Sequence, residues 1–199
     1  MLEEWQHDGS QLRKISLSNR EKQYVLGTML GTSSIIWAKN SKTPHLQMRE
    51  SICKGGNWLR CKAEELKKFS RPKSFILDKY SFRWNSVADD CWIDFYNLCY
   101  QNEIKTINIK WLDQLQDIGI AVWMIDKGQI NSKNCYIRVS RMSNESIETC
   151  IDYFKIIQIP CQYKRIGGSH TIFFEKDSYK KIIKLISPCF PVYLRNKIS

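Results

Sequence analysis

Apolar and polar residues follow two alternating periods along this chain. Between residues 21 and 30 apolar side chains recur three and four positions apart, which predicts a helix that ends at Gly31. A short β-prone run, Ser34–Ala38, and a run that alternates polar and apolar residues, His45–Glu50, predict the strands of a β-hairpin. The elements predicted next are a helix over 58–69 capped by Asn57, strands within 73–87, and a helix over 91–100 capped by Asp89 and Asp90.

The second half of the chain repeats this order. The elements predicted there are a helix over 115–125 stopped by Gly128, a strand over 135–140, a helix over 144–158 capped by Ser143, a hairpin of 162–166 and 171–175, and a last helix over 179–186 capped by Ser178. We therefore predict an α+β fold of two pseudo-symmetric αββαββα repeats, each with an antiparallel sheet. The expected division is a flexible arm over 1–15, a first repeat over 16–110 and a second over 111–199.

Composition and charge narrow the class of protein. The 199 residues are 43% apolar and 26% charged, which is enough for one large domain or two small ones. The formal charge of +11 favours nucleic acid as the partner, with an anionic membrane surface as the main alternative. No apolar run is long enough to span a bilayer, and the first residues do not resemble a signal peptide. We expect a soluble intracellular protein, in an organelle matrix or the cytoplasm.

Cysteine spacing argues against a metal site. The eight cysteines include no C-x-x-C pair, and no histidine lies near them at zinc-finger spacing. Most have apolar neighbours, which is typical of reduced thiols in a core. We therefore expect a reducing compartment, with no metal and no cofactor.

Small residues recur in or just after the two apolar helices predicted over 21–30 and 115–125. Gly27 and Gly31 are four apart, and Ala121 and Gly128 occupy comparable places in the second half. Small residues at such positions allow two helices to cross closely, although an ordinary buried helix pair explains the same pattern. Both segments run into a short turn and then a strand.

These two segments resemble the motifs of the LAGLIDADG homing endonucleases, specifically the monomeric two-repeat kind encoded within introns. Residues 24–35, Tyr-Val-Leu-Gly-Thr-Met-Leu-Gly-Thr-Ser-Ser-Ile, are similar to the first motif. Residues 120–130, Ile-Ala-Val-Trp-Met-Ile-Asp-Lys-Gly-Gln-Ile, are similar to the second and more specific motif, and 191–197 resemble the closing segment. The resemblance covers roughly residues 19–199. It implies two motif helices packed at a pseudo-twofold axis, with two four-stranded sheets lying in a DNA major groove.

The resemblance also implies where catalytic acids should stand. In the family one acid from each motif, just before the terminal glycine, holds divalent metal between the scissile phosphates. The matching residues are Thr32 and Lys127; threonine is a poor Mg²⁺ ligand and a protonated lysine is none. Asp126 is one residue away, about 100° around the helix, so it is at best a possible rescue. In the first repeat the nearest carboxylate is Glu21, several turns upstream. We expect no catalytic residues, and Mg²⁺ only if the endonuclease alternative holds.

Basic residues of the predicted strands are the candidate nucleic-acid contacts, because a period of two sends them to one face. At Lys127 an ammonium in place of the metal would hold a phosphate, and a solvated lysine is the equal alternative. The full set is Lys39, Lys42, Arg49, Lys73, Lys79, Arg83, Lys127, Lys133, Arg138, Arg141, Lys164 and Arg165. The aromatic residues expected to reach bases are Trp37, Tyr80, Trp84, Tyr136 and Tyr163.

Three functions remain open at this point. The favoured one is a catalytically inactive LAGLIDADG descendant, monomeric by itself, that binds DNA or structured RNA as a splicing cofactor (maturase), regulator or ribonucleoprotein component. The second is an active double-strand DNA endonuclease. The third is a protein-interaction module whose basic charge is incidental.

Overall fold

The computed structural model describes residues 15–54, 56–130, 135–140 and 142–197. Almost all of the predicted N-terminal arm, residues 1–14, lies outside the described residues.

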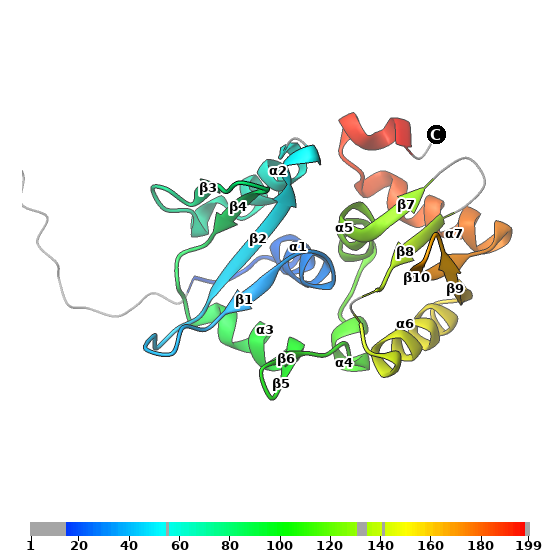
Figure 1. Ribbon diagram of the computed structural model, residues 1–199, viewed down its shortest axis with the longest axis horizontal. Coiled ribbons are helices and arrows are strands. Elements are labelled where there is room, and N and C mark those ends of the chain that lie inside the picture. The colour runs from blue at the N-terminus through cyan, green and yellow to red at the C-terminus, as the bar shows by residue number, and fades with distance from the viewer. Residues whose placement is uncertain (1–14, 55, 131–134, 141, 198–199) are drawn as a thin grey trace, which may run out of the picture.

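The same seven elements occur twice along the chain (Figure 1). The first run is α1 (Asn19–Leu30), β1 (Ser34–Ile36), β2 (His45–Ser51), α2 (Asn57–Glu65), β3 (Phe75–Leu77), β4 (Ser81–Asn85) and α3 (Cys91–Cys99). The second run is α5 (Asp117–Lys127), β7 (Gly128–Ile130), β8 (Cys135–Arg138), α6 (Asn144–Ile156), β9 (Cys161–Ile166), β10 (Ser169–Phe174) and α7 (Lys176–Ile186). This order confirms the predicted αββαββα repeats. The boundary between residues 110 and 111 stays a prediction, and the short helix α4 (Ile109–Leu112) spans it.

Several local predictions are wrong, each for a local reason. The helix expected over 58–69 ends at Glu65, and Lys67–Phe69 form a separate 3-10 turn. Ser178 does not cap α7, because the first bond of that helix already runs from the Tyr179 amide to the Glu175 carbonyl. The pattern also gave no sign of β7 or of the link between the repeats. That link contains β5 (Tyr100–Gln101), β6 (Ile104–Lys105) and α4.

Each repeat contains one four-stranded antiparallel sheet. The strand orders are β1-β2-β4-β3 and β7-β8-β10-β9, so corresponding strands occupy corresponding places. Ser34 pairs with Gln47 in the first sheet, and Gln129 pairs with Tyr136 in the second. Ser34 and Gln129 stand two residues after Thr32 and Lys127, respectively. The register therefore makes Gln47 and Tyr136 equivalent, and likewise the arginines two residues later in each strand.

Helices α1 and α5 lie side by side between the two sheets (Figure 1). A Cβ atom on Gly27 would stand 2.3 Å from the Gly119 carbonyl oxygen, and one on Gly31 would stand 2.1 Å from Asp126 Oδ2. The predicted role of these two glycines in close helix packing is thus met by the geometry. Gly128, which directly follows α5, differs because its Cβ would meet Met124 of α5 rather than a residue of α1. Gly119 makes the close approach from α5, while Ala121 is simply buried.

One hydrophobic core runs through both repeats and the seam between them. It contains four fully buried tryptophans and five of the eight cysteines, and within the described residues none of the eight forms a disulfide. Burial raises the pKa of the Cys99, Cys135 and Cys161 thiols to about 12, so they stay protonated. The predicted core thiols are thus confirmed for these five. None of the helices within the described residues is long and apolar enough to cross a membrane.

Candidate nucleic-acid interface

The C-terminal ends of α1 and α5 open into one groove of about 1380 Å³. Thr32 lines it just beyond α1 and Lys127 lines it at the last position of α5. Arg49 and Arg138 line it from the second strand of each sheet. The two ends that the motifs predict to be partners therefore share one cavity with basic residues from both repeats.

Asp126 does not face this groove as a free carboxylate. Its side chain is 2% exposed and accepts hydrogen bonds from Lys62 Nζ at 2.7 Å, Trp58 Nε1 at 2.6 Å and the Thr28 hydroxyl at 3.1 Å. Lys62, on α2, is itself 1% exposed and also donates to the Thr28 hydroxyl. A buried carboxylate with a buried ammonium and two further donors is a structural ion pair. The one-residue shift from Lys127 thus turns Asp126 into the seam between the repeats, as helix geometry predicts.

Lys105 brings a further positive charge to the groove from the link between the repeats. Its Nζ donates to the carbonyl oxygens of Met29 at 2.9 Å and Ser33 at 2.5 Å, and so caps the end of α1. The pKa of Lys105 is lowered to about 8; burial is the largest cause and the charge of Lys127 adds to it, while Cys99 and Asp126 act in the opposite direction. The C-terminal ends of α1 and α5 therefore lie beside the ammonium groups of Lys105 and Lys127.

The residues of the groove do not fit a divalent metal. Its acidic lining residues are Glu50 and Asp126. Glu50 is 7% exposed, and its Oε2 accepts the backbone N–H of Leu59. Thr32 donates its hydroxyl to the Arg49 carbonyl oxygen at 2.8 Å. Mg²⁺ prefers carboxylate oxygens that are free to coordinate, and within the described ranges no cluster of three His, Cys, Asp or Glu side chains exists that would hold an ion.

The outward faces of the two sheets carry only part of the predicted basic set. Arg49 and Arg83 lie directly opposite each other on β2 and β4, and Arg138 and Lys164 flank Thr171 on the other sheet. Like charges directly opposite each other destabilise a sheet unless an anion lies over them. Within the described chain Arg83 leaves its buried Nε without a hydrogen bond, while its Nη2 pairs with Asp78.

Other members of that set do not share this face, so the prediction of a single face is wrong. Arg165 is adjacent to Lys164 and pairs with His170, so it points to the opposite side of its sheet. Four lysines lie in turns or loops beside the strands: Lys39, Lys42, Lys73 and Lys79. Lys133 and Arg141 lie outside the described residues.

The aromatic residues expected to reach bases divide in the same way. Trp84 is wholly buried in the core, whereas Tyr136 is nearly buried on the same face as Arg138, where its hydroxyl donates to Gln129. Tyr163 points to the same side as Arg165, where its hydroxyl contacts His170. Trp37 and Tyr80 remain exposed.

Two important residues were missed from the sequence. Lys62 lies on the apolar side of α2, between Leu59 and Ala63, and a lysine on such a face is the signal that it has an internal partner. Lys105 gave no comparable signal, because it lies in a two-residue strand of the link.

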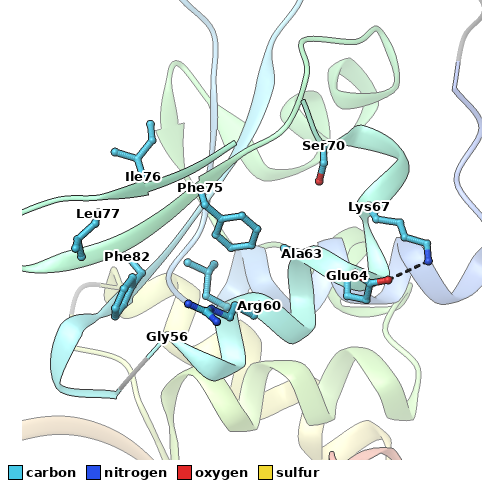
Figure 2. Close-up of a pocket in the computed structure, with 11 residues that line it drawn as sticks. Gly56, Arg60, Ala63, Glu64, Lys67, Ser70, Phe75, Ile76, Leu77 and Phe82 are labelled. Carbon is cyan, nitrogen blue, oxygen red and sulfur yellow. Dashed lines mark hydrogen bonds and ion pairs between the residues drawn. The ribbon is translucent and has the colours of Figure 1, made fainter. Parts of the chain in front are cut away.

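A second cavity, of about 630 Å³, lies between α2 and β3 (Figure 2). Its walls are largely apolar, with Phe75 and Leu77 of the edge strand facing Ala63 and Phe82. Glu64 and Lys67 on its rim pair with each other at 2.9 Å. None of the predicted nucleic-acid contacts lines it, so the candidate interface is the central groove and the sheet faces beside it.

Comparisons with known proteins agree with this arrangement. The model of the LAGLIDADG DNA endonuclease family matches residues 22–182. The fold is similar to that of the homing endonuclease I-WcaI bound to its DNA recognition sequence, with a TM-score of 0.82 and 16% identity over 93% of this chain and 88% of that chain. It is also similar to I-DmoI in complex with DNA and Mn, with a TM-score of 0.55 and 12% identity over 85% and 97% of the two chains. The search of curated proteins gave no match. The chain belongs to the LAGLIDADG DNA endonuclease family.

Proposed function

We propose that this LAGLIDADG chain binds duplex DNA in the concave surface formed by its two sheets and does not cleave it. The observation that carries the proposal is the state of the acids in the groove. The motif positions are Thr32 and Lys127, and the neighbouring Asp126 is held by Lys62, Trp58 and Thr28. Without free carboxylates at the helix ends, nothing there would position a metal ion or activate water.

Binding does not require those acids. The groove presents Lys105, Lys127, Arg49 and Arg138 from both repeats, and a run of cations along a groove releases counterions from a phosphate backbone. The homing endonuclease I-WcaI, whose fold is similar, was solved bound to its DNA recognition sequence. That likeness favours duplex DNA over structured RNA as the partner, and the presence of both repeats in one chain favours a monomer as the binding unit.

The binding test uses the full chain with a pool of random DNA duplexes and, in parallel, a pool of folded RNAs. We expect enrichment of specific duplexes, and weaker, unselective retention of RNA. Selective enrichment of RNA alone would reassign the chain to RNA binding, and retention of neither pool at about 50 mM salt would support a protein-interaction role instead.

The cleavage test uses a plasmid that carries an enriched duplex, incubated with Mg²⁺ or Mn²⁺. We expect the wild-type protein to shift the plasmid and leave it supercoiled. Specific linear product from the wild-type protein would overturn the proposal, and its loss in Asp126→Asn, checked for folding by circular dichroism, would identify that residue as the rescuing acid.

A further inference from the structure

Arg49 and Arg138 occupy the same position in the two sheets. The pairings of Ser34 with Gln47 and of Gln129 with Tyr136 make β2 and β8 equivalent, and each arginine stands two residues further along its strand. At the neighbouring outward positions the repeats differ: Asn85 corresponds to Phe173, Arg83 to Thr171 and Ile76 to Lys164. Among these described outward-facing positions, the position of Arg49 and Arg138 is the one at which both repeats carry a cation.

Each of these arginines is held by a glutamine side chain. Arg49 Nε donates to Gln47 Oε1 at 2.8 Å, and Gln47 in turn donates to Asn85 Oδ1 at 3.0 Å. Arg138 Nη2 donates to Gln129 Oε1 at 3.2 Å, and the Tyr136 hydroxyl donates to the same oxygen. Both side chains are exposed and line the central groove. The glutamine holds one edge of each guanidinium, and the arginine that carries it lines the groove.

A guanidinium held in this way matches one base edge. In the major groove guanine presents two adjacent acceptors, O6 and N7, and a fixed arginine fork donates to both. A phosphate contact would not require such positioning, because phosphate accepts from a mobile arginine or lysine in many orientations.

We infer that Arg49 and Arg138 are a matched pair of guanine-reading residues, one in each repeat. This inference rests on the proposed binding of duplex DNA. Because a pseudo-twofold axis relates the two positions, the two guanines lie on opposite strands at equal distances from the centre of the target. The target is then partly palindromic at this one pair of positions, whereas the flanking positions differ between half-sites, as Asn85 differs from Phe173.

The test is selection from random duplexes with wild type, Arg49→Lys and Arg138→Lys. Lysine keeps the charge and loses the planar fork, so phosphate binding is largely retained. We expect a wild-type consensus with a guanine in each half-site, and each variant to lose the preference at one guanine only. Duplexes substituted at that guanine should bind wild type about 10- to 100-fold more weakly, and the matching variant almost equally well. Arg60→Lys, an exposed residue of α2 outside the groove, is the control and should leave the consensus unchanged.

The outcomes separate the inference from the proposed function. An unchanged consensus in both lysine variants, or a uniform loss of affinity for every sequence, would overturn guanine reading while leaving DNA binding in place. Binding without any consensus would overturn it as well. Failure of wild type to bind any duplex would overturn the proposed function itself. Thermal unfolding of each variant checks that the fold is intact.

Discussion

The ion pair of Lys62 and Asp126 is the residue-level feature that occupies the Asp126 carboxylate beside the groove. The two charges are buried against each other at the junction of α2, α1 and α5. We predict that Lys62→Met alone and Asp126→Asn alone each cost about 3–5 kcal/mol of unfolding free energy, because either change leaves a buried polar group without its partner. The double variant Lys62→Met/Asp126→Asn should cost less than the sum of the two single variants, because the pair is coupled. Urea denaturation measures all three, and single-variant losses below about 1 kcal/mol would contradict a structural role.

Lys105 supplies a residue-scale prediction about pH. Its pKa is lowered to about 8, chiefly by burial, and the groups that face it are Cys99, Lys127 and Asp126. A bound phosphate favours the charged ammonium, so binding takes up a proton once the pH passes 8. DNA affinity should therefore be full below pH 8 and should fall as the pH rises above it, by up to about tenfold per pH unit. Equilibrium binding at fixed salt between pH 7 and 9.5 measures this dependence.

The control for this pH dependence is Lys110→Met, on the exposed side of α4, which should behave as wild type. Lys105→Met should bind more weakly at pH 7 and show no fall above pH 8. An equal fall in wild type and Lys105→Met would assign the titration to another group.

At the scale of elements, the seam of α1 and α5 depends on the absence of side chains. Gly27→Ala would place a Cβ 2.3 Å from the Gly119 carbonyl oxygen and 2.8 Å from Val122 Cβ, and backbone cannot yield as a flexible side chain does. We predict a loss of several kcal/mol of unfolding free energy, more than overpacking an ordinary core site, which costs about 1–3 kcal/mol. Asn97→Ala, at an exposed position of α3, is the control and should change stability by less than about 0.5 kcal/mol. Chemical denaturation of the two variants decides the point, and similar midpoints would refute the close approach.

Sequence periodicity predicted the long elements because each of them buries a regular stripe of apolar side chains. It failed where an element is held by contacts distant in sequence. β7 is three residues long and exists because it pairs with β8, and Lys105 depends on the carbonyl groups of α1. Gly119 had a sequence signal that was overlooked: it lies seven residues before Asp126, on the same face of α5. The positions of Thr32 and Lys127 at the helix ends were predictable, because each follows from a motif that is local in the sequence. Lys62, the partner of Asp126, was not predictable because it lies on a different helix, α2.

At the scale of the whole molecule, the repeat determines what each half can contribute. The equivalent strands β2 and β8 each place one arginine in the groove, Arg49 and Arg138. Lys105 lines the groove from the link between the repeats and has no counterpart in either repeat. The two halves are therefore alike near the centre and different at the edges. The equivalent edge strands β3 and β9 also differ. In the second repeat α6 packs along β9, whereas in the first repeat α2 packs on β2 and β4 and a cavity separates it from β3.

The net charge of +11 leads to a prediction for the molecule as a whole, which also decides between the two interpretations of Lys127. The logarithm of DNA affinity should fall linearly with the logarithm of salt concentration, by about 0.9 for each phosphate neutralised. If Lys127 holds a phosphate at the groove centre, Lys127→Met lowers this slope by about 0.9; if it holds none, the slope is unchanged. Lys180→Met, on the exposed side of α7 and outside the groove lining, is the matched control and should retain the wild-type slope. Fluorescence anisotropy from about 50 to 300 mM salt gives all three slopes. An affinity that stays constant over this range would contradict the phosphate-binding groove altogether, because an interface lined by lysine and arginine cannot bind a polyanion without releasing its counterions.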